Sequence, residues 1–141
     1  MYDIERINSL VDDLLRFSLD LKEINLNESN INDLRNLHAS AMLIFAIMNR
    51  TIDLAEEILV KNDLPMPSSY SDCFPALAKA GLIDKKLADL LESFIKQRGL
   101  FAHHYYDMNK KIILKLCKDT SIAAIFIEKV KELVRKSLKS K

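Results

Sequence analysis

The sequence predicts an all-α protein, an antiparallel four-helix bundle with one additional short helix. Two observations support this fold class. Apolar residues recur at three- and four-residue spacing through most of the 141 residues, as in amphipathic helices, and no segment shows the alternation of a strand. The chain also has only two Gly and three Pro, so its elements are long and its turns are few. We expect one domain over residues 1–141.

The first two helices are predicted from their apolar stripes. The first stripe consists of Ile4, Ile7, Val11, Leu14 and Leu21. After the Asn-rich turn NLNESN, Ser29 or Asn30 is expected to cap a second helix of about nine turns. Its stripe consists of Ile31, Leu34, Leu37, Ala41, Ile44, Met48, Ile52, Ala55 and Leu59. It is expected to end near LPMPSS, because two prolines and paired serines cannot continue a helix.

Local signals place the remaining helices. A short helix is expected over about residues 74–80, with Gly81 as its left-handed stop. Asp84 is expected to cap the next helix. The buried stripe of that helix consists of Leu87, Leu91, Phe94 and Ile95. A final helical region is expected over about residues 108–139, bent at residues 119–121, where a new N-cap can form.

Composition excludes several classes of protein. Cys73 and Cys117 lie far apart with no CxxC partner, so neither a disulfide framework nor a zinc site is indicated, and a reducing cytoplasm is the expected compartment. The N-terminus lacks the basic start and apolar run of a signal peptide. The longest apolar run, AMLIFAIM, is far shorter than the roughly 20 residues that cross a bilayer, so no membrane association is expected.

Charge is distributed unevenly along the chain. Residues 1–95 hold 9 Lys/Arg and 16 Asp/Glu, whereas residues 96–141 hold 12 Lys/Arg and 4 Asp/Glu. This asymmetry is consistent with contact to an anion, either a nucleic acid or an acidic protein. A solvated, lysine-rich C-terminal helix explains it equally well.

The basic third begins at the stretch RGLFAHHY, residues 98–105. Arg98 follows Leu87 by 11 residues, about 20° around a helix, so it lies on the apolar stripe. A guanidinium there must be paired or must face a cleft. It can therefore line a site, extend to solvent from the helix end, or pair internally with a carboxylate such as Asp53.

On a straight helix His103 points about 140° away from Arg98, whereas Tyr105 shares its face. Either the helix ends near Ala102 and the HHYY segment folds back, or a second copy of the chain contributes its own motif to the same cleft. His38 lies in the middle of the second helix and is expected to be a packed core histidine.

Arginine and histidine together suit cleavage of an RNA phosphodiester. A histidine exchanges protons with the ribose 2′-hydroxyl or the leaving 5′-oxygen. An arginine stabilises the charge on the phosphoryl oxygens. This chemistry requires no metal, and the sequence indicates no metal site and no cofactor.

The spacing of Arg98, His103 and Tyr105 matches the R-x-x-x-x-H-x-Y motif, and the chain resembles HEPN domains, particularly the HepT-like toxins of HepT–MntA toxin–antitoxin systems. The likeness extends over about residues 1–138. It includes the progression from NRTIDLAEEILVKNDLPMPSSYSDCFPALAKAGLID to the motif. It implies a HEPN bundle, usually a homodimer, that acts as a metal-independent endoribonuclease.

The resemblance implies roles for individual residues. Arg98 and His103 correspond to the catalytic pair, and Tyr105 to the tyrosine that a nucleotidyltransferase antitoxin modifies with AMP. Gly99 departs from the Asn that commonly follows the arginine, which puts the level of activity in doubt.

Four further residues are candidates for substrate contact or support. A looser spacing of the motif selects His104 and Tyr106, which we expect to contact RNA. Asn49 and Asp53 form an i, i+4 pair expected to support Arg98, unless they serve only as solvent-exposed polar residues.

The leading hypothesis is a ribonuclease toxin that cleaves RNA in a composite dimer cleft and is neutralised by an MNT-type nucleotidyltransferase antitoxin. The alternative is a non-catalytic HEPN subunit that binds a nucleotide or a nucleotidyltransferase. A third possibility is a helical assembly module in which Arg98 forms a dimer salt bridge.

Overall fold

The computed structural model describes residues 1–139, except for the side chain of Tyr106. The regular elements within those residues are all helices, and none of the residues forms a strand. In chain order the elements are α1 (Ile4–Ile24), α2 (Leu34–Lys61), α3 (Cys73–Lys79), α4 (Lys85–Lys96), α5 (Arg98–His103), a 3₁₀ turn (Tyr105–Asp107), α6 (Lys110–Asp119) and α7 (Ser121–Lys139). The all-α prediction is therefore confirmed.

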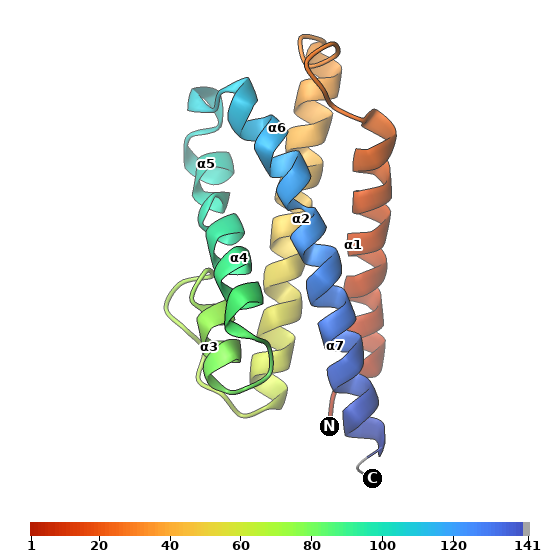
Figure 1. Ribbon diagram of the computed structural model, residues 1–141, viewed down its shortest axis with the longest axis vertical. Helices are drawn as coiled ribbons and strands as arrows, with labels where there is room; N and C mark the ends of the chain where they lie inside the picture. Colours follow the sequence, from red (N-terminus) through yellow and green to blue (C-terminus); the bar gives the residue numbers. More distant parts are fainter. Residues whose placement is uncertain (140–141) are drawn as a thin grey trace.

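The helices form four columns (Figure 1). Helices α1 and α2 run antiparallel, α4 and α5 together make the third column, and α6 and α7 make the fourth. The short α3 lies at the lower end, beside the start of α4. The motif segment α5 continues the α4 column toward the opposite end, and the turn after it leads to the start of α6. This arrangement is the predicted antiparallel bundle, with α3 as its additional short helix.

The core fills the space between these columns. Leu14 of α1, Ile44 of α2 and Phe94 of α4 are fully buried or nearly so. Phe74 of α3 packs edge-on against Phe126 of α7, with ring centroids 5.7 Å apart. Removing these apolar surfaces from water is the main favourable term in folding. The core thus fixes α2 and α4, the two helices on which the motif segment depends.

Two residues predicted to be buried are exposed. Ile4 is 37% exposed and Leu34 is 65% exposed. Each is the first residue of its helix, and the first turn of a helix has fewer neighbours to cover it than the middle turns have. The remaining stripe of the α4 column, including Leu87 and Leu91, is buried as predicted.

Side chains cap four of the helices. Asp3, Asp33, Asp84 and Asn109 each accept a hydrogen bond from a backbone N–H in the first turn. The predicted cap at Asp84 is confirmed by its 2.7 Å bond from the Leu87 N–H. The prediction of Ser29 or Asn30 as the cap of α2 was wrong. Asn30 instead accepts a bond from the Asn27 N–H and closes the turn that precedes Asp33.

The two remaining local predictions have different outcomes. Gly81 adopts a φ of 77° just after α3, as the left-handed stop requires. The helix also breaks between Asp119 and Ser121, as predicted. However, the hydroxyls of Thr120 and Ser121 donate to carbonyls of the preceding turn and do not cap α7. The break therefore joins α6 to α7 without a new side-chain N-cap.

Candidate active site

Arg98 is the first residue of α5 and is held by side chains from two other parts of the chain. Its Nε donates a 2.6 Å hydrogen bond to Oδ1 of Asn49 on α2. Its guanidinium carbon lies 5.3 Å from the ring centroid of Phe45 and 4.8 Å from that of Tyr70. Tyr70 belongs to the loop between α2 and α3. An amide and two aromatic rings thus fix the orientation of this guanidinium.

The contacts of Arg98 leave part of its hydrogen-bonding capacity available. A guanidinium has five N–H donors, and among the side chains that the structure describes only the one on Nε has a hydrogen-bond partner. The Arg98 residue as a whole is half-buried, so it is not enclosed by the described part of the chain. Two parallel N–H groups of this kind bind the oxygens of a phosphate in a forked geometry.

Asn49 and Asp53, predicted together as support for Arg98, behave differently. Asn49 contacts Arg98 directly. Asp53 instead pairs with Arg50 one turn away on the same helix, with a 3.0 Å separation between Nη2 and Oδ2. The alternative in which Asp53 neutralises Arg98 is therefore wrong, because the nearer arginine takes the carboxylate. Of this predicted pair, Asn49 provides the polar support.

His103 is the last residue of α5, and its side chain is exposed. It lies five residues after Arg98 on the same helix, which separates the two side chains by about 140° around the axis. No hydrogen bond joins it to Arg98 within the described part of the chain. His104 is also exposed and lies 3.8 Å from the carboxylate of Asp107. One copy of the chain therefore does not bring the predicted catalytic pair together.

The segment after α5 does fold back, but it carries Tyr105 and not His103 toward α2. A 3₁₀ turn begins at Tyr105, and its hydroxyl forms a hydrogen bond with Nδ1 of His38. The two rings lie 5.7 Å apart at 38°. Burial raises the pKa of the Tyr105 phenol. The predicted role of Tyr106 concerns a side chain outside those that the structure describes.

The prediction that His38 is a packed core histidine was wrong, because its side chain is exposed. Sequence analysis also assigned no role to Phe45 or Tyr70. The spacing of residues in α2 could have indicated part of this site, because His38, Phe45 and Asn49 lie within about 40° of one another on the helix wheel and so share one face. Tyr70 lies in a loop, so no periodicity connects it to Arg98.

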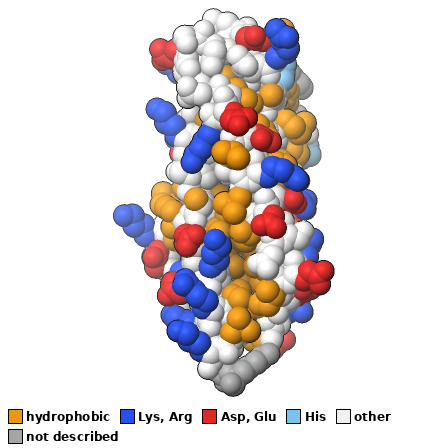
Figure 2. Space-filling view, turned by 90° about the vertical axis from the view of Figure 1, so that its right-hand side faces the viewer, with side chains coloured by type: hydrophobic (Ala, Val, Ile, Leu, Met, Phe, Trp, Pro, Cys, Tyr) orange, Lys and Arg blue, Asp and Glu red, His pale blue; other side chains and the backbone are white. Residues whose placement is uncertain are grey.

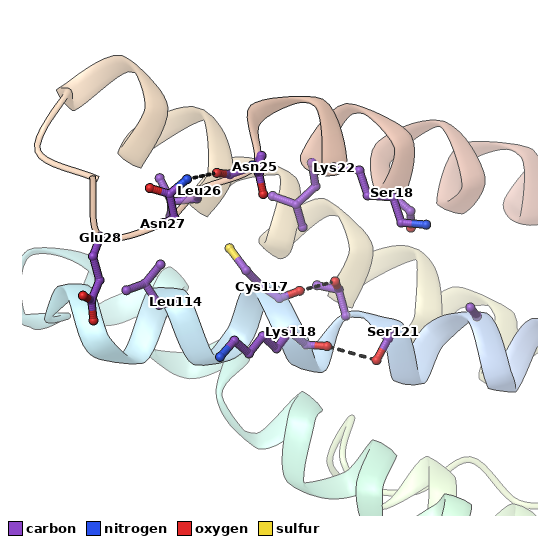
Figure 3. A pocket seen from close by; sticks show the side chains of 13 residues that line it. Ser18, Lys22, Asn25, Leu26, Asn27, Glu28, Leu114, Cys117, Lys118 and Ser121 are labelled. Carbon is purple, nitrogen blue, oxygen red and sulfur yellow. Dashed lines mark hydrogen bonds between the residues drawn. The ribbon is translucent and has the colours of Figure 1, made fainter. Parts of the chain in front are cut away.

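A hollow on the surface lies away from this site (Figure 3). It has a volume of about 610 Å³ and lies between the turn after α1 and the junction of α6 with α7. Lys22, Glu28 and Lys118 are the charged groups at its walls. None of the predicted site residues lines it, so it is separate from the motif.

Charges of both signs are mixed on the surface. Figure 2 shows a vertical band of apolar side chains with Lys or Arg and Asp or Glu on both sides of it. Within α7, Lys129 and Lys136 both lie close to Glu132, at 3.5 and 3.3 Å. The basic third of the sequence is therefore partly neutralised in space. Lys110 and Lys111, at the start of α6, are the basic residues that follow the motif most closely in sequence.

The described residues contain neither a membrane-spanning helix nor a cluster of metal-binding side chains. None of the helices in residues 1–139 is both long enough and apolar enough to cross a membrane. No cluster of three or more His, Cys, Asp or Glu in the same residues is arranged to hold a metal ion.

Comparison with known proteins shows the same fold and identifies the family. In sequence, 63 residues are 33% identical to the mRNA nuclease HepT of Shewanella oneidensis, and the match spans 45% of this chain and 47% of that protein, about half of its length. In structure, the chain matches a tri-AMPylated S. oneidensis HEPN toxin in complex with its MNT antitoxin, with a TM-score of 0.83 at 23% identity over 94% of this chain and 99% of the toxin. It also matches the cytosolic protein YutE of Bacillus subtilis, of unknown function, with a TM-score of 0.80 at 16% identity over 98% of this chain and 96% of YutE. The family model for HepT-like ribonucleases matches residues 4–136, so the chain belongs to the HepT-like ribonuclease family.

Proposed function

We propose that this protein is the toxin of a toxin–antitoxin pair, a metal-independent endoribonuclease that cleaves RNA in a composite dimer cleft and acts in the cytoplasm. The observation that supports this most strongly is the state of Arg98. Its guanidinium is oriented by Asn49 and two aromatic rings, yet its terminal amino groups have no hydrogen-bond partner among the side chains that the structure describes. An arginine that served only in packing would not need this combination.

The reaction is a transesterification of the RNA backbone. The ribose 2′-hydroxyl gives its proton to an imidazole, its oxygen bonds to the neighbouring phosphorus, and the bond from phosphorus to the 5′-oxygen breaks as that oxygen takes a proton. His103 exchanges these protons, and Arg98 stabilises the negative charge that increases on the phosphoryl oxygens. Single-stranded RNA is the expected substrate, because its backbone can adopt the in-line geometry.

A homodimer accounts for the separation of Arg98 from His103 within one chain. Two copies that meet over this end of the bundle place His103 of one copy opposite Arg98 of the other. Leu34 and Met42, both about two-thirds exposed on α2, supply apolar surface for such a contact. The start of α6, with Lys110 and Lys111, contributes positive charge that guides the RNA backbone.

An MNT-type nucleotidyltransferase antitoxin neutralises the toxin by attaching AMP to Tyr105. The S. oneidensis HEPN toxin matched above is AMPylated and bound to an MNT antitoxin, which supports this assignment. AMP on Tyr105 adds bulk and negative charge next to the start of α2. His104 and Tyr106, the neighbours of Tyr105, are assigned to RNA contact.

Complementation between inactive variants tests the composite site. Arg98→Ala and His103→Ala are each expected to be inactive toward RNA in the presence of EDTA. When the two are mixed in equal amounts and allowed to exchange subunits, half of the dimers are heterodimers, and in each heterodimer one of the two clefts has both residues intact. About a quarter of the wild-type activity should therefore return. Equal cleavage by wild type, Arg98→Ala and His103→Ala, each assayed by itself, would refute the catalytic roles of Arg98 and His103. A mixture of the two variants that stays inactive would refute the composite cleft. Cleavage by neither wild type nor variants would favour the alternative of a non-catalytic partner-binding subunit.

A further inference from the structure

We propose that His38 is the catalytic base for nucleotidyl transfer to Tyr105, taking the phenol proton while the Tyr105 oxygen attacks the α-phosphorus of a nucleoside triphosphate. This inference rests on the proposed function, in which Tyr105 is the modified residue. In this proposal the toxin chain itself supplies the general base for the AMP addition that inactivates it.

The geometry places the base directly on the reacting atom. Nδ1 of His38 forms a hydrogen bond with the Tyr105 hydroxyl, although the two residues are 67 positions apart in the sequence. The contact forms because α5 ends at His103 and the following 3₁₀ turn directs Tyr105 back toward α2. The Tyr105 ring is half-buried against the bundle, and the His38 side chain is exposed. The pair therefore forms within one copy of the chain, and its exposed histidine can be reached by a second protein.

The phenol needs such a base. An ordinary tyrosine has a pKa near 10, so roughly one molecule in a thousand is ionised at pH 7. Burial raises the pKa of Tyr105 further and keeps its proton in place. Because the neutral phenol is a poor nucleophile, removing the proton during attack lowers the barrier. Imidazole is the side chain best suited to exchange a proton near neutral pH.

The neighbours of His38 leave it able to accept that proton. No carboxylate of residues 1–139 forms an ion pair with its ring nitrogens, and Nδ1 contacts the Tyr105 hydroxyl. With Nδ1 as acceptor, the phenol O–H is the donor and Nε2 carries the ring proton. This tautomer leaves His38 ready to become an imidazolium.

The transfer step balances as follows. The bond between the Tyr105 oxygen and the α-phosphorus forms, the bond from that phosphorus to the bridging oxygen breaks, and pyrophosphate leaves. The phenol proton moves to Nδ1 of His38 and passes to water, since the side chain is exposed. Before that loss, the imidazolium lies beside the new phosphodiester and stabilises its negative charge.

The experiment measures the initial rate of AMP addition to Tyr105, followed by intact mass and peptide mapping, with the full-length chain, its cognate nucleotidyltransferase and ATP. His38→Gln keeps a polar side chain of similar reach but cannot take a proton at neutral pH. We expect its kcat for transfer to fall by at least about 100-fold with little change in KM, the loss typical of a missing general base. Arg35→Gln, on the same turn of α2 with a side chain 94% exposed, is the control and should transfer at the wild-type rate within about twofold.

A second variant separates proton transfer from a structural role. His38→Ala should be equally slow, and imidazole added to the buffer should restore at least tenfold of its rate, because the free base enters the vacated space. The proposal for His38 would be overturned by a His38→Gln variant that transfers AMP at the wild-type rate, or by a His38→Ala variant that imidazole does not rescue. In either case, AMP addition to Tyr105 of the wild-type chain would leave the proposed function intact. If the wild-type chain itself takes no AMP on Tyr105, both this proposal and the proposed neutralisation fail. The ribonuclease assay above then reports separately on RNA cleavage.

Discussion

Replacement of Asn49 by Ala is the sharpest test of how Arg98 is positioned. The substitution removes the oxygen that accepts the 2.6 Å bond from Nε, and leaves Phe45 and Tyr70 beside the guanidinium. A hydrogen bond to a charged group contributes about 1.5–3 kcal/mol net. If that whole contribution is lost at the transition state, cleavage slows by about 10- to 160-fold, since 1.36 kcal/mol corresponds to a factor of ten.

The loss should fall on kcat, because Arg98 is assigned to charge that increases only in the transition state. The assay is cleavage of single-stranded RNA in EDTA, with thermal unfolding measured beside it to show that the variant is folded. The double variant Asn49→Ala/Arg98→Ala should cleave no more slowly than Arg98→Ala alone. A residue that acts only through Arg98 has no effect once Arg98 is absent.

Asp53→Asn is the matched control on the same helix. It removes a partly exposed ion pair with Arg50 and leaves the contact between Asn49 and Arg98 in place. Pairs of this kind contribute about 0–1 kcal/mol, so the cleavage rate should stay within about fivefold of wild type. Asn49→Ala with wild-type kcat, or Asp53→Asn as slow as Asn49→Ala, would refute the assignment of Asn49 as the positioning residue.

Three other measurements probe the same structure. Tyr70→Ala should slow RNA cleavage by about 2- to 30-fold through loss of a cation–π contact, while Tyr70→Phe should not. Gly99→Ala should stabilise the fold by about 0.5–1 kcal/mol in urea unfolding, because an added Cβ meets nothing within 4 Å, whereas Gly81→Ala should destabilise it by about 1–2 kcal/mol at a φ of 77°. Burial raises the pKa of Cys73 to about 11. Because the thiol ionises more readily in the unfolded chain, the free energy of unfolding should decline from pH 9 to 11. The difference in that free energy between wild type and Cys73→Ala should shrink over the same range.

The elements that sequence analysis placed well are those whose signals are local. The stripe of Leu87 and Leu91, the cap at Asp84 and the stop at Gly81 each depend on residues within one or two turns. The start of α2 was missed because several good capping residues occur in one short stretch, and only the turn made by Asn27 and Asn30 selects Asp33. Local chemistry alone does not rank such competing caps.

The site was predictable only in part, for a related reason. The motif identified Arg98 and Tyr105, but their partners come from distant parts of the chain. His38 was expected in the core because its neighbours along α2 are apolar. Its exposure depends on how the other helices pack against this part of α2, and the sequence of α2 alone does not determine that packing. Tyr70 reaches Arg98 from a loop, where no repeating spacing exists to be analysed.

Helix α2 is the common support for both proposed reactions. Asn49 and Phe45 hold Arg98, and His38 on the same face holds Tyr105. The 11 residues from His38 to Asn49 place the two contacts about 16 Å apart along the helix. Effects of substitutions at such a distance usually add. In each assay the double variant His38→Gln/Asn49→Ala should therefore equal the sum of its single variants in free energy. A marked departure from that sum would mean that the two sites are coupled through α2. AMP on Tyr105 would then act on Arg98 through the helix as well as by occupying the composite dimer cleft.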